Sequence, residues 1–259
     1  MRFDGVEIKV TLGRDLTEQA VQELELPTED PWQIWFWEDV TPGDGPGAPL
    51  LDRGVILRAR DKARGDDDAT VKLRPCRRSQ LTDRWLAATK GKTQDGDKWE
   101  LKLEADWSGD RRVLAASHSC ERPGGVVREA GRGDRPVEDL FTPDQQTFIQ
   151  DCSGTAINLA TLTALPPVTA TRWKEVAAAP PGLDVRAERW TVGDLDFLEL
   201  SVVADLGEAR RRQADLTAFV WSRGLPIGSQ QQSKTRQVLE HLVARAVEPA
   251  LTAGQEEDR

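Results

Sequence analysis

Apolar and polar residues alternate along several short segments of this chain. In GVEIKVTL (residues 5–12), the apolar Val6 and Ile8 alternate with the charged Glu7 and Lys9. A period of two places successive side chains on opposite faces of a strand, so this segment is predicted to be a half-buried β-strand. Alternation, or a composition rich in β-branched and aromatic residues, predicts further strands at residues 33–40, 57–60, 71–74, 99–107 and 195–205.

Other segments show the 3.6-residue period of amphipathic helices. The clearest helix start is Thr142 as N-cap, followed by Pro143 at the first helical position and Gln145 where a capping box places it. Further helices are predicted at residues 14–26, around 216–220 and at 233–251. Residues 121–136 are predicted to form a flexible loop and an internal boundary. This order of elements favours a mainly antiparallel β fold with added helices.

Charged residues occupy alternate positions of four predicted strands. One strand carries Arg58 and Arg60 on a single face, and the next carries Lys72 and Arg74. These faces either are solvated, as is common in antiparallel sheets, or point into a closed barrel. In a barrel, the cations would repel one another unless a multivalent anion lay between them. A polyphosphate suits paired arginines better than a carboxylate does.

Composition narrows the classes of protein that fit. The chain has 259 residues, a formal net charge of −9 and 38% hydrophobic residues, and its pI of about 5.0 argues against a reader of long nucleic acid. It contains no run of about 20 apolar residues, and its first residues lack the apolar core of a signal peptide. We therefore expect no membrane association and a cytoplasmic location. Cys76, Cys120 and Cys152 are odd in number and widely spaced, which argues against a disulfide framework or a thiolate zinc site.

The order and spacing of these motifs resemble those of the CYTH proteins, also called triphosphate tunnel metalloenzymes. That family includes thiamine triphosphatases, inorganic triphosphatases, RNA triphosphatases and some adenylate cyclases. The resemblance runs from GVEIKV to SKTRQVL, about nine tenths of the chain. The matching positions are Glu7 and Lys9 for the first strand motif ExExK, residues 57–60 for LRxR, Lys72 for a lysine-bearing strand, Arg172 for a later arginine, Glu199 in FLELS for FxExE, and Lys234 for the lysine that opens the last helix.

The resemblance implies a closed antiparallel β-barrel flanked by helices, in one α+β domain over residues 1–252 with an acidic tail at 253–259. It implies divalent-metal-dependent phosphoryl transfer, with Mg or Mn held by Glu7 and Glu199. Glu188 is a further acidic candidate for the catalytic set, together with Lys9. By resemblance or strand parity, the phosphate-binding residues are Lys9, Arg58, Arg60, Lys72, Arg74, Lys102, Arg172 and Lys234.

The sequence departs from the family pattern at two acidic positions. Gly5 stands at the first glutamate of the leading motif, and Ser201 stands at the second acid of the late strand. Glu104 and Asp106 have the strand parity to supply an oxygen instead, and Glu104 is a further candidate metal ligand. Their alternative role is ion pairing with Lys102 and neighbouring arginines. The aromatic residue that marks the thiamine-specific branch is replaced by Ile56, which argues against thiamine triphosphate.

Two classes of function are compatible with these residues. The first is hydrolysis of inorganic triphosphate or a nucleoside triphosphate inside the tunnel. The second is a non-catalytic module that binds polyphosphate or nucleotide, which the missing carboxylates favour. A cyclase is compatible with the same tunnel. The expected partner is a small triphosphate or polyphosphate; the oligomeric state stays open, and a homodimer is compatible with the sequence. His118 is expected in a polar loop, and Trp35 and Trp37 in core packing.

Overall fold

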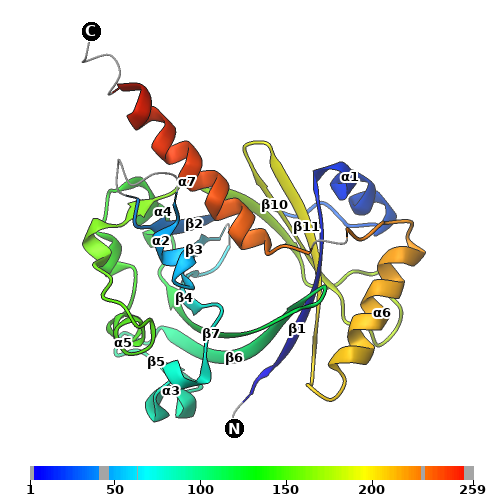
Figure 1. Cartoon of the computed structure of the whole chain (residues 1–259), viewed down its shortest axis with the longest axis horizontal. Coiled ribbons are helices and arrows are strands. Elements are labelled where there is room, and N and C mark those ends of the chain that lie inside the picture. Colours follow the sequence, from blue (N-terminus) through cyan, green and yellow to red (C-terminus); the bar gives the residue numbers. More distant parts are fainter. Residues whose placement is uncertain (1–2, 41–46, 63, 229–230, 254–259) are drawn as a thin grey trace. The chain divides into compact units, whose positions relative to one another are not determined.

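The computed structural model describes residues 3–40, 47–62, 64–228 and 231–253 (Figure 1). Its strands are β1 (Gly5–Leu12), β2 (Trp32–Glu38), β3 (Val55–Asp61), β4 (Asp67–Leu73), β5 (Lys90–Lys92), β6 (Lys98–Ser108), β7 (Arg111–Arg122), β8 (Thr163–Ala164), β9 (Val168–Trp173), β10 (Arg186–Val192) and β11 (Leu195–Ala204). Its α-helices are α1 (Arg14–Glu23), α2 (Pro49–Asp52), α3 (Asp83–Ala87), α4 (Val126–Arg132), α5 (Pro143–Cys152), α6 (Ala209–Ser222) and α7 (Lys234–Ala253). From residue 254 on, the predicted acidic tail lies outside the described residues.

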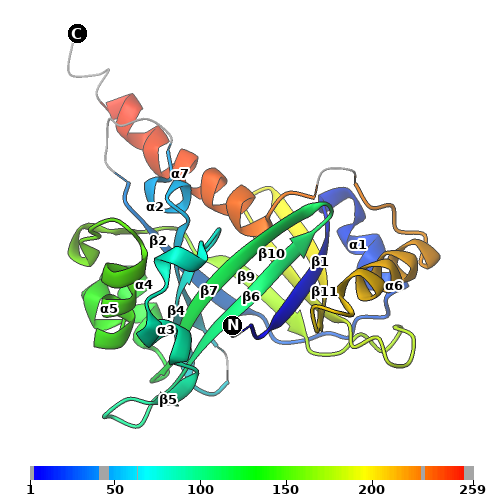
Figure 2. The ribbon, with the colours of Figure 1, turned by 60° about the horizontal axis from the view of Figure 1, so that its bottom comes forward.

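The strands form a closed β-barrel. Hydrogen bonding follows the order β1-β11-β10-β9-β2-β3-β4-β7-β6, and β6 pairs again with β1. Strand β5 extends the sheet beyond β6, and β8 pairs with β2. The prediction of a closed barrel flanked by helices is therefore confirmed. One detail differs from the prediction, because β1 and β6 pair in parallel and the barrel is mixed (Figure 2).

The chain divides into two compact units. Unit 1 comprises Met1–Trp32, Leu103–Ala115 and Val168–Lys234, and unit 2 comprises Gln33–Lys102, Ala116–Pro167 and Thr235–Arg259. The prediction of a single domain over residues 1–252 stays a prediction. Among the described residues, no helix combines the length and the apolar character that a bilayer crossing requires.

In unit 1, an apolar core orients the first strand. Val6, Ile8 and Val10 of β1 are buried in one cluster with residues of α1 and α6, such as Ala20 and Phe219. Figure 1 shows these two helices beside β1 and β11, which they contact. Because successive strand residues point to opposite faces, burial of these positions turns Glu7 and Lys9 to the other face of the sheet. The predicted half-buried strand is confirmed.

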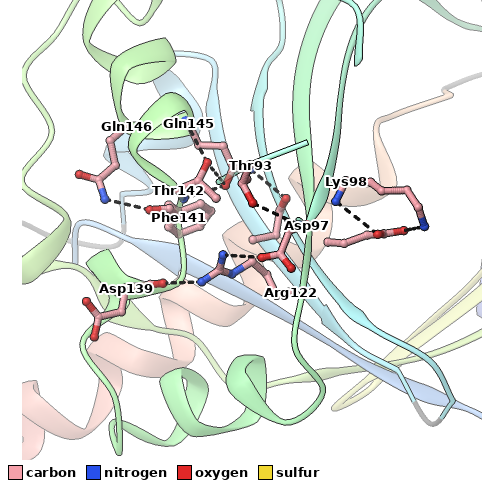
Figure 3. A network of polar contacts seen from close by, with 11 residues as sticks. Thr93, Asp97, Lys98, Arg122, Asp139, Phe141, Thr142, Gln145 and Gln146 are labelled. Atoms are coloured by element: carbon pink, nitrogen blue, oxygen red, sulfur yellow. Dashed lines mark hydrogen bonds and ion pairs between the residues drawn. The ribbon is translucent and has the colours of Figure 1, made fainter. Parts of the chain in front are cut away.

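In unit 2, the predicted capping box begins helix α5. The Thr142 side chain accepts a hydrogen bond from the Gln145 backbone amide at 3.3 Å, and the Thr142 amide donates to Gln145 Oε1 at 3.1 Å (Figure 3). Gln145 Nε2 also donates to the carbonyl oxygens of Ala69 and His118, both at 2.9 Å. One buried side chain thus begins the helix and anchors it to β4 and β7. The helix ends at Cys152.

Two local predictions are wrong. The segment 121–136 is not a loop throughout, because it contains α4, whose Val127 is buried. The buried Asp67 carboxylate accepts hydrogen bonds from the backbone amides of Gly125 and Val127 and so holds the helix start in place. His118 does not lie in a polar loop; it lies in β7 and is 1% exposed. Both errors arise because the stabilising partners are distant in the sequence.

Candidate functional site

In unit 1, strand register places a set of acidic side chains on one face of the sheet. Glu7 lies beside Asp106 of β6. Thr11, on the same face of β1, lies opposite Glu199 of β11, and Glu199 lies opposite Glu188 of β10. Directly paired residues point to the same side of a sheet, so all these carboxylates lie on the face opposite the apolar core.

The first pair of carboxylates shares the ammonium of Lys9. Lys9 Nζ lies 2.8 Å from Glu7 Oε2 and 3.1 Å from Asp106 Oδ2. Lys9 is 9% exposed and Asp106 is 7% exposed. In such an environment an ion pair is screened little by solvent. Lys9 therefore bridges β1 and β6 through a salt bridge on each side.

The second pair of carboxylates shares the ammonium of Lys234. Lys234 Nζ lies 2.9 Å from Glu188 Oε2 and 3.4 Å from Glu199 Oε1. The same nitrogen lies 4.1 Å from the centroid of the Trp190 ring, a cation–π contact. Lys234 is 3% exposed and is the first residue of α7. The sequence prediction named Glu188, Glu199 and Lys234 separately, and the structure brings them together.

Other predicted residues of unit 1 share this face. Arg172 of β9 lies opposite Glu188, and Glu104 of β6 lies beside Gly5. Ser201 lies opposite Lys9. The parity predicted for Glu104 and Asp106 is therefore confirmed, although Asp106 pairs with Lys9 and not with Lys102.

The backbone conformation at Gly5 disfavours a glutamate at this position. Its φ of +137° is a backbone conformation that side-chain-bearing residues rarely adopt, and a Cβ there would lie 3.4 Å from both the Ala204 carbonyl oxygen and Val203 Cγ1. A carboxylate at this position would thus require a change in the backbone. Ser201 contributes a neutral hydroxyl at the other position.

In unit 2, three predicted cations share one face of the β3–β4 pair. Arg58 lies opposite Thr70, Arg60 lies opposite Asp68, and Lys72 lies opposite Ile56. Arg58, Arg60 and Lys72 are half-buried, whereas Leu57 and Ala59 on the other face are buried. The predicted common face of these three cations is therefore confirmed.

A carboxylate outside the predicted strands 57–60 and 71–74 lies among these cations. Asp68 belongs to β4, and its two oxygens accept hydrogen bonds from Arg60 Nε at 2.8 and 3.0 Å. Lys62 Nζ lies 2.7 Å from Asp68 Oδ2. Burial raises the pKa of Asp68, but the charges and hydrogen bonds of Arg60 and Lys62 outweigh burial, so its pKa is below its ordinary value of 3.8. Asp68 thus neutralises part of the positive charge.

Two predicted phosphate-binding residues of unit 2, Arg74 and Lys102, lie outside strands β3 and β4. Strand β4 ends at Leu73, so Arg74 is the first residue after it. Lys102 Nζ lies 3.3 Å from Glu100 Oε2, and both side chains are more than two fifths exposed. Lys102 therefore has the exposed ion pair of a solvated strand face.

The carboxylates do not fit the divalent-metal centre that the resemblance implies. Within the described part of the chain, no group of three or more His, Cys, Asp or Glu side chains is placed to hold a metal ion. In each carboxylate pair of unit 1, a lysine ammonium stands within ion-pair distance of both members. The Mg or Mn site at Glu7, Glu199 and Glu104 stays a prediction.

Sequence reasoning missed Asp68 and Trp190 as members of these charged faces. Trp190 follows Glu188 on the same face of β10. The segment RAERWTV does not alternate, because its buried residues, Ala187 and Trp190, are three positions apart, so no period of two identifies it. The sequence around Asp68 indicates a turn, because three consecutive aspartates, Asp66, Asp67 and Asp68, are uncommon in strands.

Comparison with known proteins identifies the fold. No protein-family model and no curated protein matches the sequence. A crystal structure named as a "putative adenylate cyclase" from Bacillus halodurans matches with a TM-score of 0.54 and 10% identity, over 91% of this chain and 97% of that chain. A protein from Pyrococcus horikoshii OT3 matches with a TM-score of 0.45 and 12% identity over 91% and 99% of the two chains. A "putative adenylate cyclase" from Vibrio parahaemolyticus matches with a TM-score of 0.41 and 10% identity over 92% and 99%. At these identities, the Bacillus structure shows a shared fold.

Proposed function

We propose that this chain is a CYTH-type protein that binds a triphosphate or another small polyphosphate. The observation that carries the proposal is the common face of Arg58, Arg60 and Lys72 on β3 and β4. These residues match the LRxR and lysine-bearing strands of the family. The fold shared with a structure named as a "putative adenylate cyclase" supports the same class of ligand.

A multivalent anion offsets the repulsion among these cations better than a single carboxylate does. Asp68 neutralises only part of the positive charge of this face, because its one carboxylate is shared by Arg60 and Lys62 and also interacts electrostatically with Arg58. Guanidinium groups donate paired hydrogen bonds that match phosphate oxygens. Lys9, Arg172 and Lys234 of unit 1, and Arg74 and Lys102 of unit 2, stay in the proposal on sequence grounds alone.

Hydrolysis of the bound triphosphate is the second candidate function. The observation that favours it is the pairing of Glu188 directly opposite Glu199, which gives the acidic face a carboxylate that Ser201 does not supply. By resemblance this reaction needs a divalent ion held by Glu7 and Glu199, but these carboxylates already form ion pairs with Lys9 and Lys234. The geometry supports binding better than it supports this reaction.

The test combines a binding measurement with a turnover measurement. Titration calorimetry with inorganic triphosphate, ATP and inorganic phosphate should show saturable binding of the two polyphosphates and weaker binding of phosphate. Phosphate release with Mg, Mn or chelator then separates the two candidates, because a binding module shows no release above that of buffer. Absence of polyphosphate binding in every buffer would refute the proposal.

A further inference from the structure

We infer that the acidic face of unit 1 holds no divalent cation, because the ammonium groups of Lys9 and Lys234 occupy its two carboxylate pairs, and that the protein therefore binds its polyphosphate as a metal-free anion. This inference rests on the proposed function and specifies the form of its ligand. By resemblance, Glu7 and Glu199 would be metal ligands. In this structure each of them forms an ion pair with a lysine instead.

The first argument is the occupation of both carboxylate pairs. Lys9 Nζ is 2.8 and 3.1 Å from Glu7 and Asp106, which is the distance of a charge-assisted hydrogen bond. Lys234 Nζ is 2.9 and 3.4 Å from Glu188 and Glu199. A divalent ion bound by either pair would lie close to an ammonium and would be repelled by it.

The second argument is the burial of Lys234. Its side chain is 3% exposed, and it contacts the Trp190 ring as well as the two carboxylates. An ammonium in this environment cannot move into solvent without leaving Glu188 and Glu199 uncompensated. Because residue 234 also begins α7, its backbone is part of a helix of 20 residues. Lys234 is therefore a buried, fixed cation of this face.

The third argument concerns the two positions at which the family's other carboxylates are missing. Gly5 has a φ of +137°, so the backbone itself disfavours a side chain there. Ser201 lies opposite Lys9, where a carboxylate would be a third partner for that ammonium. Neither position therefore adds a carboxylate to the pairs that Lys9 and Lys234 already bridge.

The deciding experiment measures affinity for inorganic triphosphate in chelator and in excess Mg²⁺. We expect saturable binding in chelator, weakened in Mg²⁺ because the metal removes the free anion; a loss of about tenfold in affinity is readily resolved by calorimetry. Binding that occurs only with metal would overturn the inference and leave the proposed function standing. Absence of binding in both buffers would overturn both.

Manganese alone gives a second readout that does not depend on any ligand. Wild-type protein titrated with Mn²⁺ and followed by electron paramagnetic resonance should show no saturable site. Lys234→Met should create one, because Glu188 and Glu199 then lose their shared cation. Lys174→Met is the matched control, since Lys174 is an exposed lysine of unit 1, and it should behave as wild type. A saturable Mn²⁺ site in the wild-type protein that Glu199→Gln removes would overturn the inference, whether or not the Lys234 variant folds.

Discussion

Lys234 is a buried cation whose charge is balanced by two carboxylates on neighbouring strands. Glu188 and Glu199 lie directly opposite each other in β10 and β11, and without Lys234 their charges would repel at short range. Burial makes this arrangement sensitive to the loss of one partner, because an uncompensated charge stays behind. The same sensitivity applies to Lys9 between Glu7 and Asp106.

Lys234→Met should therefore lower the free energy of unfolding by about 3 kcal/mol. Adding Glu199→Gln should recover part of this loss, because it removes one of the uncompensated charges. Urea denaturation of the single and double variants measures both effects, with Lys174→Met as the control that leaves stability unchanged. Equal stability of Lys234→Met and wild type would show that the ammonium does not hold the carboxylate pair together.

His118 is a buried residue whose ionisation is coupled to its burial. It packs against Trp85, Trp99 and Phe148, and within the described residues its Nδ1 has no hydrogen-bond partner. Burial lowers its pKa from 6.5 to about 4. The imidazole is therefore neutral in the folded protein over a range of pH in which the unfolded chain takes up a proton.

The sign of the resulting pH dependence follows from proton uptake. Between pH 6.5 and about 4 the unfolded state binds more protons than the folded state, so stability should fall as the pH is lowered through this window. The complete loss from this one group is roughly 3 kcal/mol at 1.4 kcal/mol per pH unit. His118→Phe should flatten the dependence in a series of urea denaturations. A wild-type slope that persists in the variant would assign the effect to other groups.

At the scale of elements, the β3–β4 pair combines a buried apolar face with a charged one. Val55 and Leu57 are buried on one face of the pair, and Arg58 and Arg60 share the opposite face. Asp68 gives this face an internal counter-charge for Arg60 and Lys62. Substituting Arg58 or Lys72 therefore leaves the Arg60–Asp68 ion pair in place.

Arg58→Ala and Lys72→Ala should each weaken triphosphate binding by about 1.5–3 kcal/mol, the range for a charge-assisted contact. Arg60→Ala should weaken binding too, and it should also lower stability at neutral pH, because the pKa of Asp68 then rises toward its ordinary value. Titration calorimetry and urea denaturation separate these effects. Arg210→Ala, an exposed position of α6, is the control. Unchanged affinity in all three variants would mean that the cations face solvent.

At the scale of the whole molecule, two strands belong to both compact units. Strand β6 runs from Lys98 to Ser108 and crosses from unit 2 to unit 1 after Lys102. Strand β7 runs from Arg111 to Arg122 and crosses back after Ala115. A continuous strand cannot lose its hydrogen bonds in one unit without disturbing the other, because both parts share one backbone.

Thermal unfolding should therefore show one cooperative transition for the whole chain. Far-ultraviolet circular dichroism and tryptophan fluorescence should give the same midpoint, and saturating triphosphate should raise it in both signals. Two separated transitions, or a ligand-induced shift in only one signal, would show that the units unfold independently and would contradict the single-domain prediction.

Local patterns in the sequence predicted strands β1, β2, β3, β4, β6 and β11, but not β7, β9, β10 or helix α4. The alternation around Glu7, Arg58 and Glu199 predicts which residues share a strand face, because side-chain direction depends only on the period of two. The Thr142 capping box predicts the start of α5, because all its hydrogen bonds lie within four residues. The barrel prediction came from the same alternation together with the family resemblance.

Only the tertiary structure decided which charges meet. Lys9 and Asp106 are 97 residues apart, and Lys234 and Glu188 are 46 residues apart. Their pairing depends on strand order and register, which no local period contains. The same holds for His118, whose burial depends on Trp85 and Phe148 from other elements. Alternation in the sequence is enough to predict that acidic and basic residues line particular strand faces. The fold places the buried Lys9 and Lys234 each between two carboxylates, because long-range strand pairing sets which charges lie close together.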